Sequence, residues 1–345
     1  MDSRERVERC MNRKTPDRLP IRHLAVDEIN GRLFKYLKVD DEESMLKRLG
    51  VDFRDIRPLM KEGCNYGITE RNLFISAYVW DCAINQAYGR RYPLAEITDI
   101  SEIPDSVFAK PDAFDYSVIR EECEKYPDHM RIFGYCEFNF IAAINDLRGA
   151  EQTYTDIALK ENVYLDLLRK RFEFTMEHIE LGLKAGGGLI DIVHFGDDFG
   201  SQRGLLISPQ SFNDIFAPMY KEAYALAHKY GAKTMLHCCG SCRDLIGRFI
   251  DLGLDILDVV QTNAARMVLE ELKEEFGRDI VFAGSMCVQN LIPNGTPAQV
   301  REEALKRAEL FREGGLIYGP SHLLQVDSKL LNIVELYGAI LGVDL

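Results

Sequence analysis

The run Leu236–Gly240 carries the residues best suited to chemistry, a histidine and two cysteines where a β-rich run gives way to a helix. Alternate side chains share one face of a strand, so His237 and Cys239 point the same way and both can reach one ion. Imidazole and thiolate together suit Zn²⁺. Two ligands do not make a site, however, and a core histidine beside unreactive buried thiols is the alternative.

Further ligand-capable side chains follow other predicted strands. His322 lies just past the last strand, where a turn would hold its imidazole above the site or let it cap a backbone carbonyl. Asp197 and Asp198 follow a strand of almost wholly apolar residues, and they could provide a fourth metal ligand, a general base or a cap for the next turn. Glu137 belongs to the same rim, with ordinary surface polarity as its alternative.

Cys239 and Cys242 also have the two-residue spacing of thiol redox motifs, at a predicted helix N-terminus that would favour thiolate. Redox domains of that kind are much shorter than this chain, and a histidine two residues upstream has no part in their chemistry. The nine cysteines are odd in number and scattered, so we expect reduced thiols or metal ligands and no disulfide framework.

The elements that must position these residues repeat as a β-rich run followed by an amphipathic helix, which is typical of parallel strands with helical crossovers. Two earlier runs and six later ones bring the predicted count to eight, the number that closes a TIM (β/α)8 barrel. An open doubly wound sheet is the competing topology, but no glycine-rich phosphate loop follows the first strand. We interpret Asn72–Ile97 as an N-terminal insertion that covers one end. The predicted strands are Leu19–Leu24, Val51–Arg57, Met130–Cys136, Leu189–Phe195, Lys233–Cys238, Leu254–Val259, Asp279–Ala283 and Leu316–Tyr318.

A barrel places its catalytic residues at the carboxyl ends of the strands, where the loops converge over the mouth. Polar and ligand-capable residues are much denser at those positions than along the predicted helices. They are Glu137, Asp197, Asp198, His237, Cys239, Gln261, Ser285 and the run Tyr318–His322.

Composition excludes several classes of protein. The 345 residues, 46% of them apolar, fit one domain over residues 1–345. A formal charge of −13 without a basic stripe argues against nucleic-acid binding. No apolar stretch approaches a membrane span, and the charged start Met1–Arg13 is unlike a signal peptide, so we expect a cytoplasmic protein.

Around the candidate ligands and carboxylates described above, the chain resembles the uroporphyrinogen decarboxylase superfamily, and within it the zinc-dependent methyltransferases that work with corrinoid proteins. The resemblance covers roughly the last two thirds of the chain and implies a barrel fold. The resemblance rests on the residues Gly196–Asp198, Leu206–Pro209, His237–Gly240, Gly253–Asp255, Phe282–Gly284, Gly295–Pro297 and Gly314 through Asn332.

Two departures distinguish between branches of the superfamily. The decarboxylases carry an arginine-rich motif near the N-terminus for substrate propionates, whereas this chain has only Arg22 in the run Pro20–Ala25. The methyltransferases bind zinc through a His-x-Cys pair, which His237 and Cys239 match, and a second cysteine in the last loop. His322 stands there instead, and histidine can replace thiolate on zinc.

The resemblance therefore implies transfer of a methyl group between a small methylated substrate, or a thiol acceptor, and the cobalt of a corrinoid (cobalamin) on a separate protein. It implies Zn²⁺ on His237, Cys239 and His322, and Asp197 or Asp198 as fourth ligand or base. We expect Glu137, Gln261 and Tyr318 to line the pocket.

Two alternatives stay open: a metal-free decarboxylase that uses Asp197, and a non-catalytic corrinoid-binding or redox-sensing protein that uses Cys239 and Cys242. The substrate, the direction of transfer and the oligomeric state are left open.

Overall fold

The computed structural model describes residues 1–61, 92, 94–103, 108 and 110–345. Seven parallel strands follow one another around a single sheet, in the order β1-β4-β5-β6-β7-β8-β9. They are β1 Phe53–Ile56, β4 Met130–Phe138, β5 Ile192–Gly196, β6 Lys233–His237, β7 Ile256–Val260, β8 Val281–Met286 and β9 Leu316–Pro320. The short strands β2 Leu59–Met60 and β3 Phe114–Asp115 pair with each other.

The predicted strand Leu19–Leu24, the first of the eight in the sequence, is present only as isolated β-bridges. Ile21 makes isolated parallel bridges to Val51, just before β1, and to Tyr318 of β9. These bridges join the two edges of the sheet, so the strands form a closed TIM-type barrel and the open doubly wound alternative is wrong. Each remaining predicted strand is present with shifted ends. The predicted insertion Asn72–Ile97 lies outside the described residues, apart from residues 92 and 94–97.

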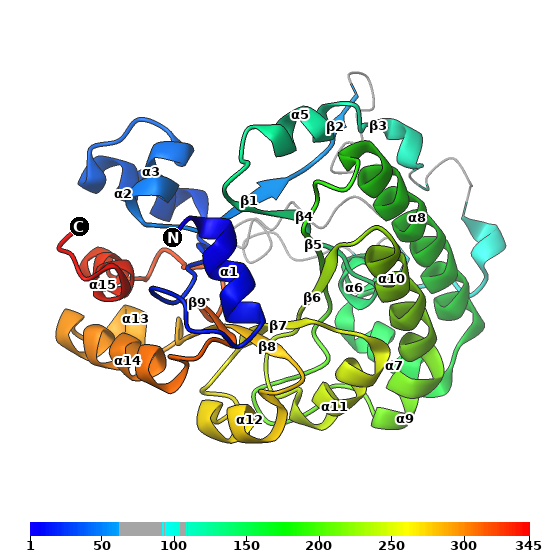
Figure 1. The fold of residues 1–345 in the computed structure, drawn as a ribbon. Coiled ribbons are helices and arrows are strands. Elements are labelled where there is room, and N and C mark those ends of the chain that lie inside the picture. Colours follow the sequence, from blue (N-terminus) through cyan, green and yellow to red (C-terminus); the bar gives the residue numbers. More distant parts are fainter. Residues whose placement is uncertain (62–91, 93, 104–107, 109) are drawn as a thin grey trace.

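Helices surround the ring of strands, as Figure 1 shows. The helices that lie before β5 are α1 Ser3–Met11, α2 Asp27–Leu37, α3 Glu42–Arg48, η2 Ile100–Glu102, η4 Pro111–Ala113, α5 Val118–Glu124, α6 Ile141–Arg148, α7 Ala150–Leu159 and α8 Asn162–Gly186. Those after β5 are α9 Pro209–Ser211, the π-helical turn η5 Phe212–Phe216, α10 Ala217–Lys229, α11 Arg243–Leu252, α12 Leu269–Phe276, α13 Leu291–Asn294, α14 Pro297–Leu310 and α15 Leu330–Leu341. Pro209 and Pro297 begin helices directly after the capping residues Ser208 and Thr296.

The apolar core has two parts, because successive strand residues face opposite ways. One part fills the barrel and includes Ile192, Met235, Ile256 and Ile317. Val7 of α1 packs into the same cluster, and Figure 1 shows α1 lying across one end of the ring. The larger part lies between the strands and the outer helices.

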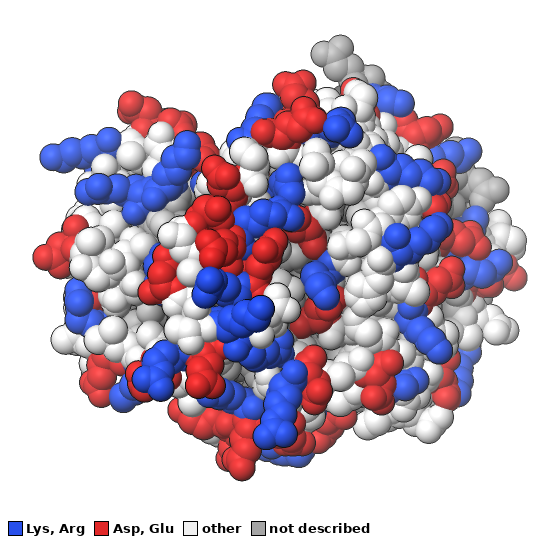
Figure 2. Space-filling model, viewed as in Figure 1, with Lys and Arg blue, Asp and Glu red and all other residues white. Residues whose placement is uncertain are grey.

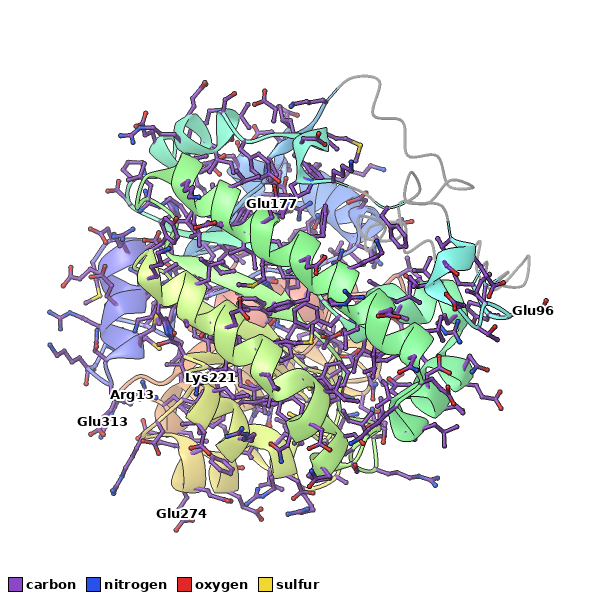
Figure 3. All side chains as sticks on the ribbon, turned by 90° about the vertical axis from the view of Figure 1, so that its right-hand side faces the viewer. Arg13, Glu96, Glu177, Lys221, Glu274 and Glu313 are labelled. Carbon is purple, nitrogen blue, oxygen red and sulfur yellow. The ribbon has the colours of Figure 1, made fainter. Side chains whose placement is uncertain are left out.

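The outer surface is charged and mixed in sign. On α8, α10 and α12, exposed Glu177, Lys221 and Glu274 point away from the strands in Figure 3. Figure 2 shows Lys and Arg interspersed with Asp and Glu on the face that α1 covers, with no basic stripe there. Among the described residues, no helix has the length and apolar character that a membrane crossing needs.

Candidate metal centre

The structure brings three predicted ligands together at the mouth of the barrel. His237 ends β6, Cys239 follows two residues later, and His322 comes from the loop after β9. One donor atom from each lies within 4.8 Å of the others, and His237 Nε2 is 3.1 Å from Cys239 Sγ. All three side chains are half-buried, so a ligand entering the mouth has access to them.

The chemistry of this donor set fits zinc. Imidazole nitrogen and thiolate sulfur are its usual protein ligands, and three of them leave a fourth position open, as in catalytic sites. His237 Nδ1 is 3.3 Å from Asp258 Oδ2, and a carboxylate only accepts hydrogen bonds, so Nδ1 carries the proton. The lone pair of His237 is then on Nε2, the atom that faces Cys239.

Burial governs the protonation of the group before any metal binds. It raises the pKa of the Cys239 thiol to about 11, although nearby His237 works against the shift. It also lowers the pKa of His322, and His237 adds to that shift. At neutral pH the group therefore offers a neutral thiol and a neutral His322 imidazole, and a bound metal would displace the thiol proton.

The loop that carries Cys239 is held by two other predicted site residues. Asp198 Oδ1 accepts a hydrogen bond from the Cys239 backbone at 2.8 Å and lies 3.9 Å from His237 Nε2. Gln261 Oε1 accepts one from Gly240 N at 2.9 Å. Gly240 has a φ of +75°, and a Cβ there would lie 2.7 Å from the Gly200 backbone, so glycine is required. Asp198 and Gln261 thus support the shape of the site.

Asp197 occupies a different place from Asp198, which corrects the prediction that treated them alike. Its carboxylate accepts hydrogen bonds from the backbone of Phe140 and Ile141 and from the Tyr220 hydroxyl. Burial nevertheless raises its pKa to about 6. Both oxygens hold the start of α6, and Asp197 is not part of the histidine–cysteine group.

Of the two other residues predicted to line the pocket, Tyr318 does not line it, and the side chain of Glu137 is not described. Tyr318 is fully buried and donates its hydroxyl to Leu336 O at 3.0 Å, so it packs against α15 instead of lining the mouth. The cause is strand alternation, because Ile317 takes the inward position. Glu137 lies on β4, but its side chain is outside the described part of the chain, and its role stays a prediction.

The sequence patterns did not identify His194 and Asp258 as site residues, and they gave Arg22 no role in the site. All three are buried inside the barrel, and Arg22 Nη1 lies 2.9 Å from Asp258 Oδ2. A signal was available: His194 and Asp258 interrupt apolar strands at positions whose alternation turns them inward. His194, His237 and Asp258 also lie close enough to share an ion. The positive charge of Arg22, which is ion-paired with Asp258, would repel a cation at this second group. The His237–Cys239–His322 group is therefore the better candidate for the metal site.

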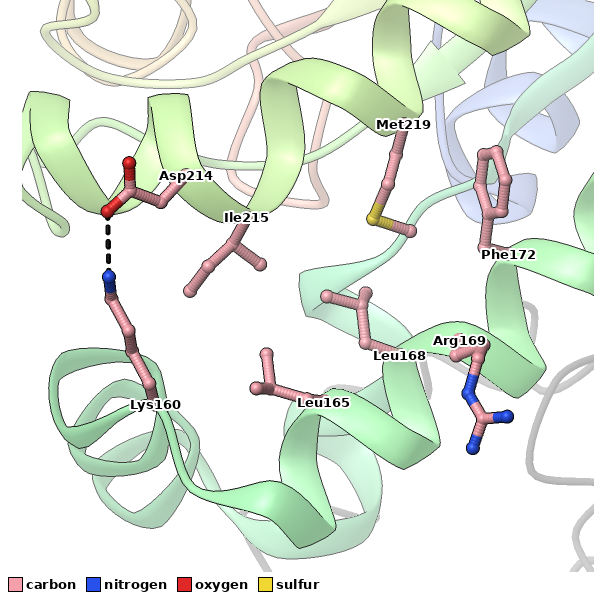
Figure 4. A pocket seen from close by; sticks show the side chains of 8 residues that line it. All are labelled: Lys160, Leu165, Leu168, Arg169, Phe172, Asp214, Ile215 and Met219. Atoms are coloured by element: carbon pink, nitrogen blue, oxygen red, sulfur yellow. Dashed lines mark hydrogen bonds and ion pairs between the residues drawn. The ribbon is translucent and has the colours of Figure 1, made fainter.

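A surface hollow lies elsewhere on the molecule. It has a volume of about 340 Å³ and lies between α8 and the η5–α10 segment. Figure 4 shows Leu165, Leu168 and Ile215 on its walls and a Lys160–Asp214 ion pair at one side. None of the three candidate ligands lines it.

Comparison with known proteins places this geometry in a family. The family model described as uroporphyrinogen decarboxylase (URO-D) matches residues 93–341, which is more than half of the chain. The chain belongs to the uroporphyrinogen decarboxylase family. Its similarity to a solved methyltransferase from Methanosarcina mazei spans 99% of both chains, with a TM-score of 0.65 at 14% identity, and supports the barrel fold.

A curated relative gives a more specific likeness over a short stretch. A methylated-thiol–coenzyme M methyltransferase of Methanosarcina mazei is 31% identical over 97 residues, which are 28% of this chain. The match spans about a quarter, 24%, of that relative's length.

Proposed function

We propose that this chain is a zinc-dependent methyltransferase that moves a methyl group between a small methylated substrate, or a thiol acceptor, and the cobalt of a corrinoid on a separate protein. The observation that carries the proposal is the convergence of His237, Cys239 and His322, with the lone pair of His237 directed at Cys239. The solved neighbour and the curated relative are both methyltransferases, which supports the same reaction class.

Each residue has a stated part in this proposal. His237, Cys239 and His322 would hold the zinc, which would supply Lewis-acid activation of an oxygen or sulfur of the small molecule. Asp258 keeps the proton of His237 on Nδ1, while Asp198 and Gln261 hold the loop that presents Cys239. The barrel mouth orients the small molecule towards the corrinoid that the partner protein brings.

The alternative of a metal-free decarboxylase receives less support. Arg22, the residue that stands in place of the arginine-rich motif, is 4% exposed and ion-paired with Asp258. Asp197, the residue proposed to hold substrate, has both oxygens engaged by backbone and tyrosine donors. Neither side chain is available at the mouth, and we therefore expect that uroporphyrinogen is not decarboxylated.

The deciding experiment measures metal first and activity second. We expect about one zinc per chain in the parent protein, and loss of most of it in His237→Ala and Cys239→Ser, because an incomplete shell binds zinc weakly. Reduced cobalamin or a corrinoid protein is then supplied with a panel of aryl methyl ethers, methanol, methylamines and methyl thioethers. Formation of methylcobalamin from one of them, absent when the protein is left out, is the expected result.

Cys287→Ser is a matched control, because Cys287 is a half-buried thiol of the loop after β8 and belongs to neither candidate ligand group. It should keep its zinc and its activity. The zinc assignment would be overturned if the parent protein contained no metal and both ligand variants were as active as the parent. A broad panel without cobalt methylation in either direction would overturn the corrinoid reaction.

A further inference from the structure

Beneath the candidate metal ligands, one buried carboxylate oxygen receives three donors. Asp258 Oδ2 lies 2.9 Å from Arg22 Nη1, 3.1 Å from His194 Nε2 and 3.3 Å from His237 Nδ1. Asp258 is 1% exposed, and its other oxygen is buried without a hydrogen-bond partner among the described residues. All the polar contacts of this carboxylate are therefore concentrated on the side that faces the arginine and the two imidazoles.

The proton positions follow from the chemistry of the donors. A guanidinium only donates, and Arg22 Nη2 is 3.1 Å from His194 Nδ1, so that nitrogen of His194 accepts. His194 is then neutral with its proton on Nε2, which donates to Asp258. The carboxylate in turn accepts from His237 Nδ1. The fixed charge of Arg22 thus determines one tautomer directly and a second one through Asp258.

The electrostatics favour an ionised Asp258. Burial opposes its ionisation, but the Arg22 charge and the hydrogen bonds from His194 and His237 outweigh burial and hold its pKa well below the usual range. Arg22 is therefore the countercharge that lets a carboxylate exist inside the barrel.

We propose that Arg22, His194 and Asp258 form a positioning relay that locks His237 in the Nδ1–H tautomer and thereby sets the metal affinity of the mouth. The relay rests on the proposed metal site for its effect on affinity, but the tautomer itself is a property of the metal-free protein. Carboxylates that orient metal-bound histidines typically contribute 10–100-fold in metal affinity. None of the three residues is a ligand in this proposal, so each acts through His237.

The test has two readouts on the same variants. Nitrogen-15 NMR of the histidine rings in metal-free protein reports the His237 tautomer, and competition with a chromophoric chelator reports zinc affinity. For Asp258→Ala we expect a mixture of His237 tautomers and a loss of zinc affinity of about 10–100-fold. Asp258→Asn, of nearly the same shape, keeps an acceptor without the charge and should fall between Asp258→Ala and the parent in both readouts. Arg22→Met should also give a tautomer mixture, since it leaves His194 free to turn.

Asp156→Ala is the matched control for general destabilisation. It breaks another buried ion pair, Arg148–Asp156 at 2.7 Å, on α6 and α7, and should leave both readouts unchanged. The relay is refuted if His237 keeps the unmixed Nδ1–H tautomer in folded Asp258→Ala, or if the zinc affinity of folded Asp258→Ala or folded Asp258→Asn stays within about twofold of the parent. If the parent binds no zinc, the proposed function fails, while the NMR result still decides the relay.

Discussion

The two ends of the barrel both contain buried or half-buried aspartates, but their surroundings differ. At the amino end, Asp52, Asp191 and Asp255 each precede a strand, and each accepts a backbone N–H from the neighbouring segment, at 2.7, 2.9 and 2.9 Å. Asp52 also pairs with Arg6 and Arg18. Arg6 lies on helix α1, and the same helix carries Arg4, which forms an ion pair with Asp191.

At the carboxyl end, Asp258 has a different kind of neighbourhood. Its partners are one arginine and two histidines, one of them a candidate metal ligand, and Oδ1 has no partner among the described residues. The amino-end carboxylates tie strands and α1 to each other, whereas Asp258 connects the interior of the barrel to the mouth. This contrast agrees with the general division of such barrels, in which the amino face serves stability and the carboxyl face serves chemistry.

The largest effect should come from the amino end. Asp52→Ala leaves Arg6 and Arg18 beside an emptied buried position, and we expect the free energy of unfolding to fall by about 3–5 kcal/mol. Urea unfolding measures this loss, and zinc titration of the folded variant should match the parent. Asp17→Ala removes a more exposed partner of Arg6 and should cost about 1 kcal/mol or less. Altered zinc affinity in folded Asp52→Ala would contradict the separation of the two ends.

Asp197 and Asp198 test the same division inside the mouth. Asp197→Ala leaves buried donors of α6 and Tyr220 unsatisfied, so unfolding should be easier by about 3 kcal/mol, with zinc affinity little changed. Asp198→Ala should do the reverse: stability within about 0.5 kcal/mol of the parent, but weaker zinc binding through a looser Cys239 loop. The same two measurements on both variants decide it, and equal effects on zinc would return Asp197 to the site.

His322 sharpens the comparison within the metal group. His322→Cys should retain zinc, because thiolate is an equally suitable ligand, whereas His322→Ala should lower zinc affinity by about tenfold or more and abolish methyl transfer. Chelator competition and the methylcobalamin assay measure the two effects. His322→Ala with the metal content and activity of the parent would show that the histidine is only a loop residue.

The sequence could predict the barrel and the three candidate ligands because both depend on local patterns. Strand alternation places His237 and Cys239 on one face, and the repeated strand–helix unit places His322 at the same mouth. The same rule, applied to Tyr318, would have turned it outward. The Asp258 relay needs four segments distant in sequence to converge, and the separation of Asp197 from Asp198 depends on where α6 begins. Such features follow from tertiary packing and not from spacing.

The last effect depends on pH, and its sign differs between the two ends. Burial alone would raise the pKa of Asp255, but hydrogen bonds from His228, Thr234 N and Lys233 lower it to about 2. A lowered folded-state pKa contributes stability that is present above the unfolded value of 3.8 and is lost as pH falls towards 2. Asp197, with its pKa raised to about 6, contributes stability that is full below 3.8 and is lost as pH rises through 6.

We therefore expect Asp255→Asn to be less stable than the parent by about 1–2 kcal/mol at pH 6, and this difference to shrink as the pH is lowered from 4.5 to 3. Urea unfolding at several pH values measures the difference. The variant removes only the amino-end carboxylate that holds the start of β6, so zinc affinity at neutral pH should be unchanged. A stability difference that stays constant down to pH 3 would mean that the ionised carboxylate of Asp255 is not what its partners stabilise, and Asp255 would then not belong with Asp52 and Asp191 among the stabilising carboxylates of the amino end.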